Sequence, residues 1–133
     1  MRIILLDLNY TLVSNSEVKL NPFEKQIENE TYRSELISKL RNDYVILITA
    51  RPEKYKRLTM ESLRRKVGFT PFGAFFNKYN LRPPQSKERV LTTQLFKSYN
   101  REAMLAIESN PQTRAMYKRH NIKAVTYQEF MEL

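Results

Sequence analysis

The sequence predicts an α/β fold, a three-layer, doubly wound (Rossmann-like) sheet of about five parallel strands with helices on both faces. Short apolar runs alternate along the chain with charged segments that have helical periodicity. The first run, IILL at residues 3–6, is apolar at every position, which is typical of a strand covered on both faces. Asp7 follows this run directly, at the strand end where open α/β sheets bind ligands.

Length and composition indicate one domain over residues 1–133. A chain of 133 residues is long enough to bury a sizeable core but too short for two ordinary domains. It contains no cysteine, which excludes disulfides, thiolate metal sites and a cysteine nucleophile. Because no apolar stretch approaches the roughly 18 residues of a membrane helix, we expect a soluble, cytoplasmic protein with no membrane contact.

The charge balance is strongly basic, with 23 Lys and Arg residues against 14 Asp and Glu and a formal net charge of +9. Such an excess favours a polyanionic partner, of which nucleic acid is the commonest. Solvated surface lysines and arginines would produce the same balance, so charge alone leaves both interpretations open.

The expected elements follow in order from these patterns. Strands are predicted at residues 3–6, 44–48, 74–76, 104–107 and 124–125. Helices are predicted at residues 31–40 and 111–119, and a further helix should begin with Pro52 in its first turn and end at Gly68. Another helix is predicted at residues 86–99, with Ser86 as its N-cap. Strands and helices therefore alternate, as parallel strands with helical crossovers require.

Polar side chains follow four of the predicted strands, at or soon after the point where each strand ends. They are Asp7 and Asn9, then Thr49 and Arg51, then Lys87, and finally Glu108, Ser109 and Asn110. Each alone could be a cap, a strand-end hydroxyl or a solvated charge. Because the carboxyl ends of parallel strands meet at one edge of the sheet, the whole set predicts a functional site. The chain has only two glycines, which excludes a glycine-rich phosphate loop.

Four short stretches around these residues resemble the motifs of the haloacid dehalogenase superfamily of phosphohydrolases. They occur in the family's order and are DLNYTL, LITAR, QSKERV and AIESNP. DLNYTL differs by one residue from the DLDYTL of magnesium-dependent phosphatases in that superfamily. The longer stretches around the later motifs are more loosely similar to polynucleotide 3'-phosphatase domains. The resemblance spans residues 3–125 and implies a haloacid dehalogenase-like fold.

The resemblance also implies the chemistry. Asp7 would be the nucleophile that forms an aspartyl phosphate, while Thr49 and Lys87 bind the transferring phosphoryl group. Asn9 takes the place of the family's second motif-one residue. Mg²⁺ would be the cofactor, and its expected ligands come from Asp7, Asn9, Glu108, Ser109 and Asn110. Contacts to a phosphorylated substrate are expected from Tyr10, Ala50, Arg51 and Arg82.

Two residues depart from the family pattern. Asn9 stands where its phosphatases have a second Asp that acts as general acid and base, and an amide cannot transfer a proton. Ser109 stands where a carboxylate metal ligand is expected. Two hypotheses follow, a Mg²⁺-dependent phosphomonoesterase with attenuated turnover, and a catalytically degenerate module that binds phosphate, nucleic acid or a protein partner.

The intervals between the motifs are too short for the cap domain that larger family members insert. The segment at residues 13–30 could form at most a small flap beside the site. A site without a lid is open to the phosphorylated end of a macromolecule. Together with the positive charge, this favours a nucleic-acid end as substrate, although a nucleotide or a phosphoprotein would also fit.

Overall fold

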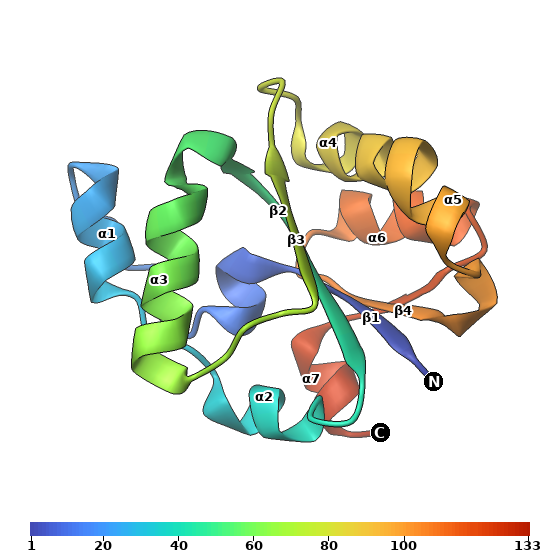
Figure 1. Cartoon of the computed structure of the whole chain (residues 1–133), viewed down its shortest axis with the longest axis horizontal. Helices are drawn as coiled ribbons and strands as arrows, with labels where there is room; N and C mark the ends of the chain where they lie inside the picture. The colour runs from blue at the N-terminus through green and yellow to red at the C-terminus, as the bar shows by residue number, and fades with distance from the viewer.

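The computed structural model describes residues 1–133 and contains one five-stranded sheet with helices on both faces (Figure 1). Every neighbouring pair of strands is parallel, and their order across the sheet is β3-β2-β1-β4-β5. The strands are β1 (Ile3–Leu6), β2 (Tyr44–Pro52), β3 (Gly73–Asn77), β4 (Met104–Ile107) and β5 (Lys123–Val125). The predicted doubly wound parallel sheet is therefore confirmed, and it carries no cap domain.

The central strand β1 is buried along its whole length because both faces of the sheet are covered. Its side chains alternate between two hydrophobic cores, so Ile4 belongs to the first core and Leu5 to the second. The register places Leu6 beside Leu47 of β2 and Ile107 of β4. Asp7 and Glu108, which follow Leu6 and Ile107, consequently emerge side by side at the carboxyl edge of the sheet, whereas β2 continues to Pro52.

Helices pack on both faces of the sheet. The helices are α1 (Phe23–Asn29), α2 (Ser34–Lys39), α3 (Lys56–Val67), α4 (Pro83–Val90), α5 (Phe96–Ser98), α6 (Pro111–Arg119) and α7 (Tyr127–Met131). Leu36, Leu63 and Phe130 bring α2, α3 and α7 against the first core. On the other face, Leu91 and Met116 join the second core from the end of α4 and from α6. In Figure 1 the α4–α6 group lies on the side of the sheet opposite α3.

Three helix starts differ from prediction. The helix predicted at residues 31–40 begins only at Ser34, because Tyr32 forms an antiparallel bridge with Val13. Strand β2 continues to Pro52, which is therefore the last residue of a strand, and α3 begins at Lys56 after the short turn Glu53–Tyr55. Arg82, and not Ser86, is the N-cap of α4, because two prolines that lack N–H groups fit its first turn. Gly68 ends α3 with φ of 63°, as predicted.

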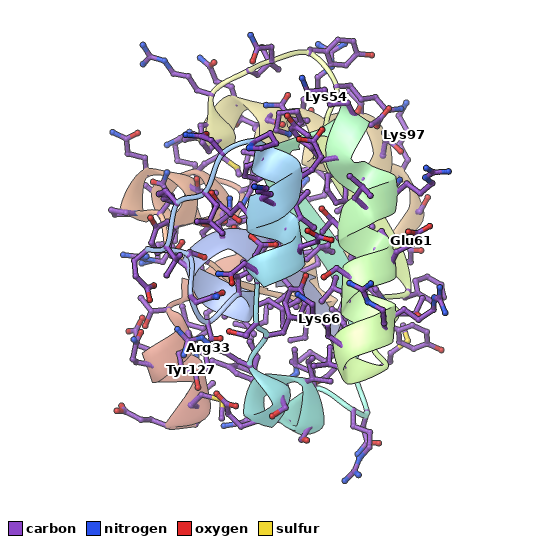
Figure 2. The ribbon with its side chains drawn as sticks, turned by 90° about the vertical axis from the view of Figure 1, so that its left-hand side faces the viewer. Arg33, Lys54, Glu61, Lys66, Lys97 and Tyr127 are labelled. Atoms are coloured by element: carbon purple, nitrogen blue, oxygen red, sulfur yellow. The ribbon has the colours of Figure 1, made fainter.

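The segment predicted as a flap contains α1, which lies alongside α3 in both views (Figures 1 and 2). Lys66 near the end of α3 ties the two helices together, because its ammonium donates to the carbonyl oxygens of Glu28 and Glu30, the latter at 2.6 Å. Residues 23–30 are therefore a fixed part of the fold. Separately, the structure contains no helix long and apolar enough to span a bilayer.

Candidate active site

The carboxylate of Asp7 lies at the centre of the sheet edge. Its backbone N–H continues the ladder by donating to the carbonyl of Ile107 at 3.0 Å. The chain then turns sharply through Leu8–Leu12, where Tyr10 adopts a left-handed conformation with φ of 62°. The turn brings Thr11 back so that its hydroxyl donates to Asp7 Oδ2 at 2.8 Å. The local sequence thus fixes the orientation of the Asp7 carboxylate.

Lys87 joins Asp7 to Glu108. Its ammonium lies 2.9 Å from Asp7 Oδ1 and 2.6 Å from Glu108 Oε1, and all three side chains are buried. Lys87 comes from α4, whereas Asp7 and Glu108 follow the neighbouring strands β1 and β4. The structure therefore brings together three of the predicted site residues. We call Asp7, Lys87 and Glu108 the Lys87 cluster.

Burial and charge set the ionisation of this cluster. Burial alone would raise the pKa of Asp7, but the Lys87 charge and hydrogen bonds from Lys87, Thr11 and Ser109 outweigh it and hold that pKa below its ordinary value. Burial raises the pKa of Glu108 to about 7 despite the same ammonium. Burial opposes the charge of Lys87, but the two carboxylates raise its pKa. At neutral pH, Asp7 is therefore ionised, whereas Glu108 is partly protonated.

The Ser109 hydroxyl lies close to two oxygen atoms of the loop that follows β1. It lies 2.8 Å from Asp7 Oδ2 and 3.3 Å from the carbonyl oxygen of Asn9. A carboxylate, a carbonyl and a hydroxyl are all hard oxygen ligands, and Mg²⁺ needs only one or two carboxylates because it retains several waters. The residues present therefore fit a magnesium ion at this point, although they include no group of three acidic or imidazole side chains.

The other two predicted metal ligands have partners within the protein. Glu108 accepts from Lys87 through one oxygen and from the backbone N–H of Asn110 through the other, at 3.0 Å. The side-chain oxygen of Asn110 caps α6 by accepting from the N–H groups of Gln112 and Thr113. The Asn110 side chain is therefore used as a helix cap. The oxygens close to Ser109 are those of the Asp7 carboxylate and the Asn9 carbonyl.

Arg51 is buried, whereas the sequence suggested either a contact to the substrate phosphate or a solvated surface position. Its side chain is 0% exposed and forms a bidentate ion pair with Glu30, with one N–O distance of 3.1 Å. It also donates to Thr59 Oγ1 at 2.9 Å and to Asn9 Oδ1 at 2.8 Å, while the ring of Phe23 lies 4.9 Å from its guanidinium carbon. Arg51 is therefore a supporting residue of Asn9, and we call Asn9, Glu30, Arg51 and Thr59 the Arg51 cluster.

This cluster fixes the orientation of the Asn9 amide. A guanidinium group can only donate, so the amide oxygen of Asn9 must face Arg51. The amide NH₂ is then directed elsewhere and remains available as a donor. Glu30 has no sequence signal that could have revealed it, because it lies in the segment predicted as a flap and meets Arg51 only after α1 has packed on α3.

The remaining predicted contacts surround the two clusters. Thr49 is buried within the last four residues of β2, where its hydroxyl oxygen accepts from the backbone N–H of Arg51 at 3.1 Å and retains its own proton to donate. Ala50 beside it is partly exposed. Tyr10 is 52% exposed, with Lys19 4.9 Å from its ring centroid. Arg82 is exposed at the N-cap of α4, and its side chain forms no hydrogen bond or ion pair with either cluster.

Sequence comparisons return nothing for this chain, since no protein family model and no curated protein matches it. Its fold does match solved structures. A chain in a structure of the Pnkp1/Rnl/Hen1 RNA repair complex superposes with a TM-score of 0.77 at 14% identity, covering 94% of this chain and 41% of the other. A second structure of a Pnkp1/Rnl/Hen1 complex gives a TM-score of 0.69 at 15% identity, with coverages of 94% and 45%.

Phosphoserine phosphatase in its apo form gives a TM-score of 0.63 at 14% identity and is covered over 98% of both chains. The chain has a haloacid dehalogenase-like fold. In this fold the chain is comparable in length to phosphoserine phosphatase but spans less than half of the matched chains from the RNA repair complexes. The fold predicted from the four motifs is thereby confirmed.

Proposed function

We infer that this protein is a Mg²⁺-dependent phosphomonoesterase that works through an aspartyl phosphate on Asp7. The observation that supports this most strongly is a buried carboxylate that lies 2.9 Å from the Lys87 ammonium at the end of the central strand. A nucleophile needs to be ionised and fixed in direction, and both conditions are met by hydrogen bonds from Lys87, Thr11 and Ser109. The haloacid dehalogenase-like fold supports the same reaction class.

In the first step, an oxygen of Asp7 attacks phosphorus, the bond to the leaving oxygen breaks, and that oxygen takes a proton from water, which leaves hydroxide. In the second step, water attacks phosphorus and loses a proton that neutralises this hydroxide, while the bond to Asp7 breaks, which releases phosphate and restores the carboxylate. Lys87 offsets the negative charge that accumulates around the phosphoryl group, and the Thr49 hydroxyl donates to one of its oxygens. Asp7, the Asn9 carbonyl and Ser109 would hold Mg²⁺, which supplies further positive charge there.

Asn9 decides how fast these steps run. Its amide can donate a hydrogen bond to the leaving oxygen but cannot give that oxygen a proton, and it cannot activate the water of the second step. Phosphate esters whose leaving groups need little protonation should therefore react best. The hydrolysis of the aspartyl phosphate should be the slow step.

The substrate we propose is the phosphorylated end of a nucleic acid. The net charge of +9 favours a polyanion, and no cap domain encloses the site. The superposition on a chain of an RNA repair complex is consistent with this substrate. A free nucleotide is the smaller substrate that the same chemistry would accept.

A second candidate function is a catalytically degenerate module that binds phosphate, nucleic acid or a protein partner. Asn9 and Ser109 favour it, since they replace an acid-base residue and a carboxylate ligand in the motifs that the sequence resembles. In such a module the Lys87 cluster would hold a phosphate without breaking an ester bond.

The two functions differ in phosphate release. The protein would be incubated with an aryl phosphate and with a 3'-phosphorylated oligonucleotide, in Mg²⁺ and in chelator, beside its Asp7→Asn and Asn9→Asp variants. The enzyme predicts Mg²⁺-dependent release that Asp7→Asn abolishes and Asn9→Asp increases. The absence of release from every form, including Asn9→Asp with the aryl phosphate, would support the binding module instead.

A further inference from the structure

A cavity of about 910 Å³ lies beside the Lys87 cluster and is lined by Ser86, but not by Asp7. It is formed where the edge strand β3 passes between the start of α3 and α4, an arrangement visible in Figure 1. We define the basic groove by the lining residues that carry its chemistry, which are Lys54, Lys56, Arg57, Lys78, Tyr79 and Arg89. In Figure 2, Lys54 lies at the upper end of α3.

The groove is far more basic than the chain as a whole. Its lining contains five Lys or Arg side chains and one carboxylate, Glu53, whereas the whole chain has 23 against 14. Glu53 offsets this charge poorly, because it lies 4.0 Å from Lys78 and both side chains are largely exposed. Lys54 and Arg57 are exposed and form no ion pair. This concentration of uncompensated cations favours a ligand with several negative charges.

The groove also offers an aromatic surface. Tyr79 is 59% exposed, and the guanidinium carbon of Arg89 lies 4.2 Å from the centroid of its ring. The loop that carries Tyr79 is fixed by Asn77, whose side chain donates to the carbonyl of Leu81 at 2.8 Å and accepts from two backbone N–H groups of the same loop. The ring is thus held in place with Arg89 against it and much of its surface open. Stacking of an unpaired base uses such a surface.

The groove and the Asp7 site are joined by shared elements. Ser86 lines the groove and is adjacent in α4 to Lys87, which contacts Asp7. On the other side, the chain passes from Thr49 through the end of β2 to Glu53 in the groove. The groove and the Asp7 site therefore adjoin along α4 and along β2.

We propose that the basic groove binds the single-stranded nucleic acid next to a phosphorylated end. The cations contact backbone phosphates, and an unpaired base stacks on Tyr79. The placement of the terminal phosphate rests on the proposed function at Asp7, whereas strand binding in the groove does not. A single strand is favoured over a duplex because paired bases do not present their faces to a side chain.

The test measures fluorescence anisotropy of a labelled, 3'-phosphorylated single strand of about eight nucleotides, in chelator so that the strand stays intact. The groove variant is Lys54→Ser/Arg57→Ser/Lys78→Ser. Its matched control, Lys118→Ser/Arg119→Ser/Lys123→Ser, removes the same charge from exposed positions on α6 and on the opposite edge strand β5. Circular dichroism would verify that both variants are folded.

Three lost phosphate contacts should lower the slope of log affinity against log salt by about 2, at roughly 0.7 per contact for a single strand. The groove variant should therefore bind about 10- to 100-fold more weakly at low salt, while the control retains most of its affinity. Equal losses in both variants, or no binding by the unaltered protein, would overturn the proposal.

Tyr79 gives an independent readout. Tyr79→Ser should weaken strand binding about tenfold, the effect of losing one stacked base, while Tyr79→Phe keeps the ring and the affinity. A blunt duplex that binds as tightly as the single strand would contradict the assignment. Hydrolysis of an aryl phosphate by the unaltered protein is measured separately, so that a failure of the phosphatase proposal is distinguishable from a failure of the groove.

Discussion

Two buried ionic clusters lie at the same edge of the sheet, and they differ in what their charges can do. The Lys87 cluster combines one ammonium with two carboxylates, so it contains an excess acid. The Arg51 cluster pairs one guanidinium with one carboxylate, and its two terminal nitrogens also donate to Thr59 and Asn9. The first cluster has one more acidic group than basic groups, whereas the second has one of each.

The difference shows which cluster can respond to a ligand. Glu108 can take up a proton near neutral pH, because burial raises its pKa to about 7. The Arg51 cluster has no second carboxylate, and its one guanidinium is paired with the carboxylate of Glu30. The Lys87 cluster, whose protonation can change, is suited to a reaction that moves charge. The Arg51 cluster is suited to holding Asn9 in position. The following predictions test this division, in order of expected effect.

The largest effect is expected from Glu30→Gln. The substitution leaves the guanidinium of Arg51 buried without a counter-ion, which costs about 3 to 5 kcal/mol of the free energy of unfolding. Urea unfolding measures the change, and Glu28→Gln, an exposed position in α1, is the matched control. A loss below about 1 kcal/mol, within the range of surface pairs, would show that the ion pair between Arg51 and Glu30 does not stabilise the fold as a buried pair should.

Lys87→Met should reduce activity strongly and stability less than Glu30→Gln does. Phosphatase activity should fall about 10²- to 10³-fold, because a donor to the transition state is lost. Stability should fall less than for Glu30→Gln, by about 1 to 3 kcal/mol, since Glu108 becomes protonated and relieves the repulsion. Paired urea unfolding and phosphate-release assays measure both quantities. A stability loss equal to that of Glu30→Gln would remove the distinction between the clusters.

Asn9→Asp tests the contribution of the missing acid. With an alkyl phosphate the rate should rise by about 10²-fold, the lower end of general acid-base effects, because Arg51 still orients the side chain. With an aryl phosphate the increase in its first step should be much smaller, since that leaving group needs little protonation. Burst kinetics separates the two steps. Equal acceleration of the first step for both esters would argue against a role in leaving-group protonation.

Ser109→Asp should have the smallest effect. A second carboxylate beside Asp7 should lower the Mg²⁺ concentration for half-maximal activity by about tenfold, a factor comparable to that of one supporting group at a metal site. In chelator, the like charges should lower the melting temperature, and Mg²⁺ should restore it. Ser109→Ala is the control. Mg²⁺ that leaves the melting temperature of Ser109→Asp unchanged would place the ion elsewhere.

Much of this arrangement follows from local sequence. The apolar runs predict the strands, and a parallel sheet brings all of their carboxyl ends to one edge without any knowledge of register. That is why Asp7, Lys87 and Glu108 could be placed together in advance. Asn110 was predicted as a metal ligand, whereas the structure uses its side chain as the N-cap of α6.

The Arg51 cluster could not be predicted in the same way. Whether Arg51 is buried depends on a counter-ion 21 residues earlier in the chain, and Glu30 reaches it only because α1 packs on α3. No periodic pattern encodes that contact. The start of α3 was misplaced for a related reason, since proline suits both the end of the strand β2 and the first turn of a helix.

The most direct test of the central claim is the capture of the aspartyl phosphate. The protein would be mixed with an aryl phosphate in Mg²⁺, quenched in acid within one turnover, and its peptides analysed by mass spectrometry. Because Asn9 cannot activate water, we predict that a phosphoryl group accumulates on Asp7, and that less accumulates in Asn9→Asp. Phosphate released with no phosphorylated Asp7 peptide, or a phosphoryl group found on another residue, would contradict the account.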